Sequence, residues 1–395
     1  MASGIQYPLR MVIMGSISSD AAPSRLFSPF KIGNLELKHR IVMAPLTRYR
    51  NDENHVPLPF VADYYAERAS TPGTLLIAEA TAVSPRGAGY SNLPGIWSKD
   101  QIASWKRVTA AVHAKKSYIF LQLWALGRVA DKEVAEKEGM KIVSPSNIPM
   151  DSEHPEPEAL SYEEIQVLVA DYGQAAKNAI EAGFDGIEIH GANGYLVDQF
   201  IQDVANQRTD EYGGSVDKRN RFALEVAKAA ADAIGADKVG FRISPFSTFQ
   251  SMKMSDPYPQ FSGLAKGLKA LNLAYLHVVE SRIAGDTAGG GTEKLDFLLD
   301  VWGDDTPFLI AGGWKPDGAL EAMDGQYKEK NVALVFGRYF LATPDLPFRI
   351  RRGLEPNKYK RDLFYAIKSK EGYLDYNFSK EWEEASKHGL DNILA

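Results

Sequence analysis

The 395-residue chain contains no cysteine, which excludes disulfide bonds, thiolate catalysis and sites that bind a metal or cluster through cysteine. Its seven histidines are scattered without the spacing of a metal site. No apolar stretch approaches the roughly 18 residues that span a bilayer. The formal net charge of -6 gives no electrostatic reason to bind nucleic acid or an anionic membrane. We therefore expect a cytoplasmic protein that binds neither nucleic acid nor a membrane.

The first residues also lack a strong pattern. Residues 1–23 carry one arginine, Arg10, several serines and no acidic residue before Asp20. That composition faintly resembles an organelle transit peptide, but no amphipathic arginine-rich face is present. The preferred interpretation is a disordered extension over residues 1–25. No linker rich in glycine, serine or proline divides residues 26–395, which are expected to form one domain.

Eight short apolar runs, many of them β-branched, alternate with longer helical patterns. Nearly continuous apolar runs are typical of parallel strands that are covered on both faces. Helical patterns between them include Ser98–Lys115, Ser215–Ile234 and a segment that opens with the capping-box spacing of Ser161 and Glu164. The apolar runs are Ile41–Ala44, Thr74–Ala80, Tyr118–Leu123, Gly186–His190, Val239–Ser244, Tyr275–Glu280, Pro307–Ala311 and Val332–Gly337.

This alternation predicts an α/β fold, a single closed (β/α)8 barrel of the TIM type. A doubly wound open sheet is less favoured because no Gly-x-Gly-x-x-Gly turn follows the first run. Ala125–Leu160 is irregular and predicts an insertion after the third strand, over the barrel mouth or one side. Ala284–Gly291, after the sixth strand, is glycine-rich and is expected to be mobile.

Glycines and a cation collect where the last two strands end. Gly312 and Gly313 follow the seventh run, and Gly337 and Arg338 follow the eighth. Glycine lets backbone N–H groups approach an anion closely, and the loops after strands seven and eight are the usual phosphate site of such barrels. Tight βα turns are the alternative explanation, but Arg338 in the neighbouring position favours phosphate.

A second group of polar residues follows the fourth strand. His190 and Asn193 lie three residues apart and could donate hydrogen bonds to one carbonyl oxygen that gains negative charge. Tyr195 comes close behind, and a tyrosine with a pKa of about 10 suits protonation of a carbanion-like carbon. This spacing predicts a site that polarises and protonates a small unsaturated molecule.

Three further polar residues lie at the same predicted end of the barrel. Arg242, in the fifth run, would be costly inside a barrel unless it faced an anion or a polar ligand, such as a reduced flavin. Thr47 and Gln122 could hydrogen-bond the edges of a flat heterocycle. Each alone could be an ordinary strand-end residue, but together they favour one site.

The residues named above lie in motifs that resemble the old yellow enzyme family over nearly the whole stretch from Leu26 to Tyr376. Any one motif is a weak signal, whereas their shared order is specific. The motifs are Leu26–Pro29, Met43–Arg48, Gln122–Trp124, His190–Leu196, Arg208–Ser215, Phe336–Arg338 and Pro344–Leu346.

The resemblance implies a monomeric or homodimeric ene-reductase that binds FMN noncovalently, is reduced by NADPH and takes an enone as substrate. His190 and Asn193 are expected to hold the substrate oxygen, and Tyr195 to be the proton donor. Trp124, Phe249 and Tyr365 are expected to line the substrate pocket. The cofactor-binding residues that it implies are Pro45, Thr47, Ala80, Gln122, Arg242, Gly312, Gly313, Gly337 and Arg338.

In the implied reaction, NADPH delivers a hydride to flavin N5 and leaves. The C=C bond of an α,β-unsaturated carbonyl or nitro compound then accepts that hydride, and Tyr195 protonates the α-carbon from the opposite face. Family branches with a hydroxyl-free aromatic at the position of Tyr195 tend toward isomerisation, so Tyr195 favours net reduction. Several stretches resemble reductases of fungal secondary metabolism, including those that act on ergot-alkaloid aldehydes.

Three alternatives stay open from the sequence. One is a flavin-bound isomerase of unsaturated carbonyls with little net use of NADPH. Another is a flavin-free barrel hydrolase that uses Glu188 and a second strand carboxylate as acid and base. The third is a flavin-binding protein without catalysis, which would leave the combination of His190 and Tyr195 unexplained.

Overall fold

The structure is a computed structural model that describes residues 24–285, 287–288 and 290–389. Of the extension expected to be disordered, residues 1–25, residues 1–23 lie outside the described residues. Ser24 and Arg25 belong to the described fold. The Ser24 side chain caps the short turn η1 (Arg25–Phe27), and the Arg25 backbone N–H donates to Asp324 at 2.8 Å.

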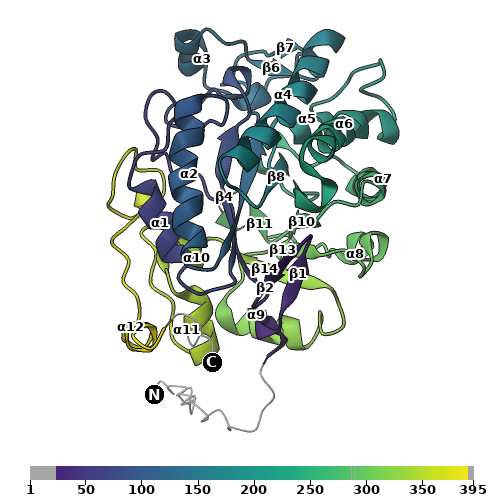
Figure 1. The fold of residues 1–395 in the computed structure, drawn as a ribbon. Helices are drawn as coiled ribbons and strands as arrows, with labels where there is room; N and C mark the ends of the chain where they lie inside the picture. The colour runs from purple at the N-terminus through teal and green to yellow at the C-terminus, as the bar shows by residue number, and fades with distance from the viewer. Residues whose placement is uncertain (1–23, 286, 289, 390–395) are drawn as a thin grey trace, which may run out of the picture.

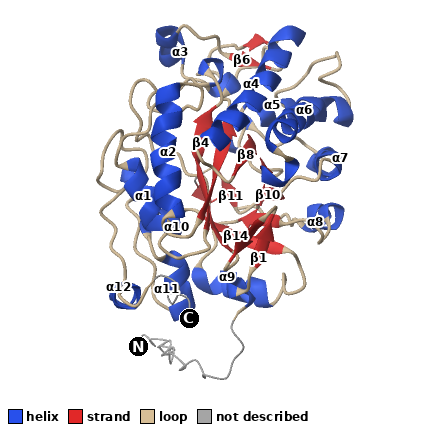
Figure 2. Ribbon diagram, in the orientation of Figure 1, coloured by secondary structure: helices blue, strands red, loops and turns tan. Residues whose placement is uncertain are grey.

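Eight parallel strands close into a barrel, which the helices surround (Figure 1, Figure 2). Each strand pairs with the next along the chain, and the last pairs with the first. All eight coincide with the apolar runs of the sequence, so the predicted (β/α)8 fold is confirmed. The strands are β3 (Ile41–Met43), β4 (Leu75–Ala82), β5 (Tyr118–Trp124), β8 (Gly186–Gly191), β9 (Val239–Ile243), β10 (Tyr275–Val279), β13 (Phe308–Ala311) and β14 (Val332–Phe336).

The main helices begin where the sequence provides caps. Ser98 and Gln101 form a capping box at the start of α2, and Ser161 and Glu164 form one at the start of α4. The buried face of α4 carries the apolar residues expected from its periodicity, and α4 packs against α6. The helices are α1 (Val61–Arg68), α2 (Lys99–His113), α3 (Lys132–Glu138), α4 (Tyr162–Glu181), α5 (Leu196–Ile201), α6 (Val216–Ile234), α7 (Pro257–Ala270), α8 (Asp296–Trp302), α9 (Pro316–Asp324), α10 (Arg338–Ala342), α11 (Leu346–Arg352) and α12 (Lys380–Ser386). Among the described residues, none of these helices has the length and apolar character of a membrane span.

The N-terminal end of the barrel is filled by a hairpin of β1 (Phe30–Ile32) and β2 (Leu35–Leu37). Phe30, Ile32 and Leu37 share an apolar cluster with strand residues such as Leu75 and Leu309. Because apolar side chains fill this end, the interior is available to a ligand from the carboxyl ends of the strands.

The predicted insertion after the third strand is present. Residues 125–160 contain α3 and a two-stranded parallel sheet of β6 (Val143–Ser144) and β7 (Glu158–Ala159), at the upper end of the view in Figure 1. Met140, Ile142 and Met150 pack on a cluster that contains Ala80 and Trp124. The insertion therefore supports one wall beside the strand ends.

The glycine-rich segment after β10 contains the antiparallel pair β11 (Ile283–Ala284) and β12 (Thr287–Ala288). Residues 286 and 289 of this segment lie outside the described residues, and its mobility stays a prediction.

Three fully buried arginines fix the segment that follows α11. Arg48 donates to the carbonyl oxygen of Gly372 at 2.7 Å, Arg50 to Ser369 at 2.9 Å and Arg68 to Tyr373 at 3.0 Å. Hydrogen bonds from a charged donor are stronger than those between neutral groups. An arginine left without partners in the interior would also be costly, so these contacts are retained. They hold the C-terminal segment, with Phe364 and Tyr365, beside the carboxyl ends of the strands.

Candidate active site

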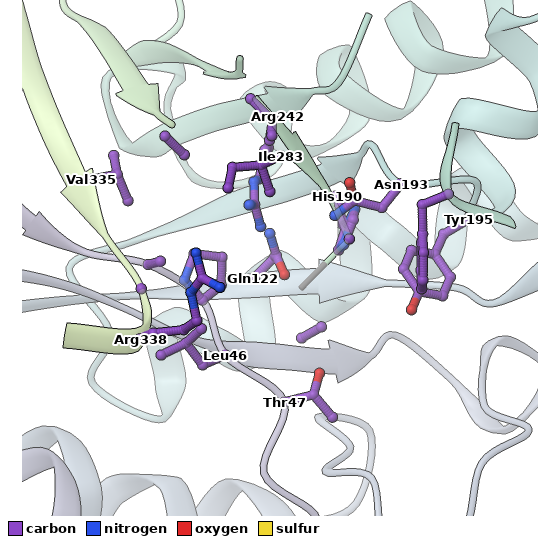
Figure 3. A pocket seen from close by; sticks show the side chains of 18 of the residues that line it. Leu46, Thr47, Gln122, His190, Asn193, Tyr195, Arg242, Ile283, Val335 and Arg338 are labelled. Carbon is purple, nitrogen blue, oxygen red and sulfur yellow. The ribbon is translucent and has the colours of Figure 1, made fainter. Parts of the chain in front are cut away.

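A cavity of about 460 Å³ lies at the carboxyl end of the barrel, and every predicted site residue contributes to its wall. Figure 3 shows Arg338 toward one end of the cavity and Tyr195 toward the other, with Gln122 between them. The predicted residues found in the wall are Pro45, Thr47, Ala80, Gln122, Trp124, His190, Asn193, Tyr195, Arg242, Phe249, Gly312, Gly313, Gly337, Arg338 and Tyr365.

At the Arg338 end, glycine backbone forms part of the wall, together with side chains such as Leu46 and Ile283. Gly313 has a φ of +65°, a conformation that favours glycine. A Cβ built on Gly313 would lie 2.9 Å from Cδ1 of Ile283 and 3.7 Å from Nη2 of Arg338, so only glycine lets the backbone lie beside the guanidinium here. A Cβ on Gly312 would collide with the Glu280 carboxylate. The arrangement fits an anion such as the phosphate of FMN, which glycine backbone and arginine can bind together.

Arg242 occupies the centre of the cavity wall. It lies on β9 in register with His190 on β8 and His277 on β10, so the three side chains share the interior face. Its Nε is buried and has no hydrogen-bond partner among the described residues. A buried cationic N–H group without an acceptor is costly. Arg242 therefore fits a ligand that brings a carbonyl oxygen or a negative charge, as a flavin ring does.

Gln122 connects the cavity to a buried carboxylate. Its Nε2 donates to Oε1 of Glu188 at 2.7 Å, and Oε2 of Glu188 lies 3.0 Å from the Tyr275 hydroxyl and 2.8 Å from Nδ1 of His277. Glu188 is fully buried and is not part of the cavity wall, and no Asp or Glu side chain of the described residues lines the cavity. The hydrolase alternative, which needs Glu188 and a second carboxylate facing a substrate, is therefore not supported.

His190 ends β8 as a neutral hydrogen-bond donor. Its Nδ1 accepts the backbone N–H of Ala192 at 3.3 Å, which leaves the proton of the neutral ring on Nε2. Burial lowers the pKa of His190 well below its ordinary value, and the charge of Arg242 lowers it further. Nε2–H is consequently available to an oxygen in the cavity across the neutral pH range.

Asn193 stands three residues later with a φ of 57°, in the left-handed region that asparagine tolerates better than most residues. Its backbone N–H donates to the Ser244 hydroxyl at 2.7 Å, while its side-chain Oδ1 is buried and has no partner among the described residues. Its Oδ1 can accept a hydrogen bond from a ligand, and its Nδ2 is the group that could donate, together with His190, to one ligand oxygen.

Tyr195 immediately precedes α5 and faces the same end of the cavity (Figure 3). Its ring meets Trp124 edge-on with centroids 4.5 Å apart, and lies 4.9 Å from the His190 ring. Burial raises the pKa of Tyr195 well above its ordinary value, and nearby Tyr90 raises it further. The phenol is therefore protonated at neutral pH, as a proton donor must be.

Several wall residues were not predicted from the sequence. Tyr49 follows the recognised Met43–Arg48 motif by one residue, and burial raises its pKa to about 12. Tyr90 and Gln250 come from loops without a pattern, and no signal in the sequence indicates them. Phe364 is the neighbour of the predicted Tyr365.

Gln250 holds the Tyr195 side of the cavity. In the amide orientation that gives both side-chain atoms a hydrogen-bond partner, the nitrogen lies 3.2 Å from the Asn193 carbonyl oxygen and 3.3 Å from that of Gly194. The amide oxygen then accepts from the Tyr195 hydroxyl at 3.2 Å. Gln250 thus joins the βα connection after β8 to the loop after β9.

Comparison with known proteins places these features in a family. Residues 25–357 match the NADH:flavin oxidoreductase / NADH oxidase family. The chain is 53% identical over 363 residues to the chanoclavine-I aldehyde reductase fgaOx3 of Penicillium roqueforti (strain FM164), covering 92% of this chain and 98% of the relative. It is 49% identical over 366 residues to the NADP-dependent oxidoreductase lnbE of Aspergillus flavus, covering 91% and 97%. The crystal structure of Old Yellow Enzyme from Pichia sp. AKU4542 aligns with a TM-score of 0.84 and 37% identity, covering 90% of this chain and 94% of that one.

Proposed function

The chain belongs to the NADH:flavin oxidoreductase / NADH oxidase family as an FMN-dependent oxidoreductase of the old yellow enzyme type, and we propose that it uses NADPH to reduce a C=C bond conjugated to a carbonyl or nitro group. One observation carries the proposal. The neutral imidazole of His190, the side-chain amide of Asn193 and the protonated phenol of Tyr195 reach one end of the cavity from the end of β8 and the connection that follows it.

The cofactor fits the other part of the cavity. Gly312, Gly313, Gly337 and Arg338 would bind the FMN phosphate without a covalent link. Arg242, Gln122 and Thr47 would bond the polar edges of the ring, while Pro45 and Ala80 pack against it. The chemistry that bound FMN supplies is transfer of a hydride from NADPH to the β-carbon of the substrate. The NADP-dependent relative supports NADPH as the reductant.

His190 and Asn193 polarise the substrate. Both donate to its carbonyl or nitro oxygen, where negative charge develops as the β-carbon becomes bonded to hydrogen. Donors fixed in place before the reaction stabilise that charge without reorganisation. Since the His190 ring is neutral, it stabilises the oxygen by donating a hydrogen bond and does not transfer its proton outright.

Tyr195 supplies the proton that completes the reduction. The α-carbon takes the hydroxyl hydrogen, and the tyrosinate left behind recovers a proton from solvent. The raised pKa of Tyr195 keeps the phenol protonated until the α-carbon becomes basic. Proton donation by Tyr195 completes a net reduction, which polarisation of the substrate by His190 and Asn193 alone would not achieve.

The aromatic wall supports a flat substrate. Tyr49, Tyr90, Trp124, Phe249 and Tyr365 line the cavity, and aromatic faces pack well on planar apolar molecules. The similarity to a chanoclavine-I aldehyde reductase supports an aldehyde as the activating group. We therefore assign a conjugated aldehyde that carries an aromatic ring system as the preferred substrate class.

An anaerobic absorption experiment tests the proposal. The purified protein is loaded with FMN, titrated with NADPH and then mixed with 2-cyclohexenone or cinnamaldehyde. Bleaching of the flavin band by NADPH and its return with either compound is the expected result. Bleaching without return would contradict enone reduction and favour an isomerase. A protein that shows no flavin band even after FMN is added would contradict the cofactor assignment.

A further inference from the structure

A layer of polar side chains lies inside the barrel beneath the cavity. Glu188, Tyr275 and His277 are all fully buried, and none of them lines the cavity. The Glu188 carboxylate accepts from Gln122 at one oxygen and from Tyr275 and His277 at the other. The reaction proposed above assigns no role to this carboxylate, although a buried acidic group is costly to retain.

The strand register explains how the layer forms. Gln122, Glu188, Gly240 and Tyr275 are successive register partners across β5, β8, β9 and β10. A Cβ on Gly240 would overlap the Tyr275 ring. The missing side chain of Gly240 is therefore what allows Tyr275 to reach across β9 and donate to Glu188.

The hydrogen bonds determine the charge of the carboxylate. The Gln122 amide, the Tyr275 hydroxyl and a neutral His277 ring are all donors to it. A protonated carboxyl group would have to give up one of these acceptor positions, whereas an ionised one accepts all three. Burial raises the pKa of Glu188, but the hydrogen bonds from His277 and Gln122 and the charge of Arg242 bring it below its ordinary value. Burial also lowers the pKa of His277, which keeps that ring neutral.

The positive charge of Arg242 lies in the next layer of interior side chains, toward the cavity. Arg242 lies in register between His190 and His277, two residues beyond Gly240 on β9. Within the described residues, no ion pair joins Arg242 to Glu188, so the two charges influence each other through the interior without direct contact. Both histidines beside Arg242 have lowered pKa values, chiefly through burial. Arg242 and Glu188 are thus the charged groups of these two layers.

We propose that Glu188 is a positioning residue and the buried counter-charge of Arg242. Glu188 orients the Gln122 amide, and its negative charge limits how strongly the site favours a negatively charged flavin. The inference rests on the proposed function, because it assumes FMN in the cavity. FMN that has taken up a hydride carries one more negative charge than oxidised FMN. Arg242 stabilises that extra charge, and Glu188 opposes it. The pair therefore sets the reduction potential at a value that permits both uptake of the hydride and its donation.

The decisive measurement compares the FMN-loaded Glu188→Gln variant with the wild type. The amide retains the shape of the side chain and removes the charge. We expect a higher flavin midpoint potential, and an affinity for sulfite increased by about tenfold or more, because sulfite adds to the oxidised ring and makes it anionic. Reoxidation by 2-cyclohexenone should be slower, while reduction by NADPH should not be.

A matched variant gives the opposite sign. Tyr275→Phe keeps the Glu188 charge and removes one of the donors that neutralise it, so the midpoint potential and the sulfite affinity should both fall by a smaller amount. A general disturbance of the barrel would move the two variants in the same direction, and that result would overturn the proposal, as would unchanged values in both. If Glu188→Gln does not fold, the direction of the Tyr275→Phe shift decides alone: a fall supports the counter-charge, and a rise or no change overturns it. Failure of the wild type to bind FMN would instead contradict the proposed function.

Discussion

The two ends of the cavity are built from different material. At the Arg338 end, glycines after β13 and β14 present backbone groups, and a single guanidinium supplies the charge. At the Tyr195 end, side chains supply the polar and aromatic groups, and they come from β5, from β8 and the connection after it, from the loop after β9 and from the segment around Tyr365. Backbone N–H groups can bind a phosphate whatever the side chains nearby, whereas single substitutions of side chains can change which substrate is bound.

This difference separates what is constant from what is specific. A phosphate requires N–H groups and a cation in one arrangement, which two adjacent strand ends can provide. A substrate of particular shape requires several side chains from segments distant in the sequence. Substitutions at the two ends should consequently affect separable steps: cofactor binding at one end, and substrate reduction at the other.

Replacing Tyr195 should have the largest effect. Tyr195→Phe keeps the ring contact with Trp124 and removes the hydroxyl, so reoxidation by an enone should slow by about 10²- to 10⁴-fold, the usual contribution of a general acid. Reduction by NADPH should keep its wild-type rate. Stopped-flow measurement of the two half-reactions checks this, and equal rates for variant and wild type in both would remove Tyr195 as the proton donor.

The oxygen-binding pair comes next. The double variant His190→Ala with Asn193→Ala should bind phenolic ligands, which mimic an enolate, about 100-fold more weakly, since two hydrogen bonds to a charged oxygen are lost. Absorption titration with 4-chlorophenol measures the affinity. His154→Ala is a suitable control, because His154 pairs with Asp151 at the surface, outside the cavity. Wild-type affinity in the double variant would contradict the oxygen-binding role.

At the opposite end, Arg338→Met should weaken FMN binding by about tenfold or more through loss of a charge-assisted bond to phosphate. Riboflavin, which has no phosphate, is the matched control ligand. Its affinity should be the same for the variant and the wild type. If the substitution weakened riboflavin as much as FMN, Arg338 would be supporting the ring or the fold and not the phosphate.

Loss of Gln250 should produce a smaller effect at the Tyr195 end. Gln250→Leu removes the acceptor of the Tyr195 hydroxyl and the donor to the Asn193 and Gly194 carbonyl groups, so enone reduction should slow by about fivefold, the value of a single ordinary hydrogen bond. FMN affinity should not change. Gln174→Leu, at an exposed pair with Asn178 on α4, is the control. An unaltered enone rate would show that Tyr195 is positioned without Gln250.

The smallest effect is expected from pH. The neutral His190 ring donates from Nε2, and its lowered pKa keeps it neutral as pH falls through its ordinary value, so the donor does not change over this range. Tyr195 must be protonated, and its raised pKa ensures this as pH rises toward 10. The rate of enone reduction should therefore be nearly flat from about pH 6 to about pH 9. A limb near pH 6.5 that disappears in His190→Asn would contradict the assigned state of the imidazole.

Much of the fold could be predicted because both faces of each barrel strand are buried. That burial makes strands such as β13 and β14 continuous apolar runs, which stand out against amphipathic helices such as α4. The polar residues predicted at the strand ends do line one cavity, since parallel strands in a closed barrel all end on the same side. Their roles toward FMN and substrate stay predictions.

Other parts could not be predicted, because they depend on contacts between distant segments. Tyr90 and Gln250 reach the cavity from irregular loops, and their sequence neighbours give no indication of it. Glu188 lies two residues before His190 on β8, and the hydrolase alternative uses it with a second strand carboxylate as acid and base. The structure instead places it beneath the cavity, where Tyr275 reaches it across Gly240.

By itself, the sequence determined the alternation of strands and helices, the closed barrel and the order of residues at the strand ends. The apolar runs of buried strands and the capping residues of helices can be recognised within each segment. Only the tertiary structure decided which side chains meet. These contacts are the polar layer of Gln122, Glu188 and Tyr275, the hydrogen bond between Gln250 and Tyr195, and the bonds from buried arginines that hold the segment around Tyr365 at the cavity. Those contacts depend on register and on the paths of connecting loops, which are set when the barrel closes and the side chains pack against one another.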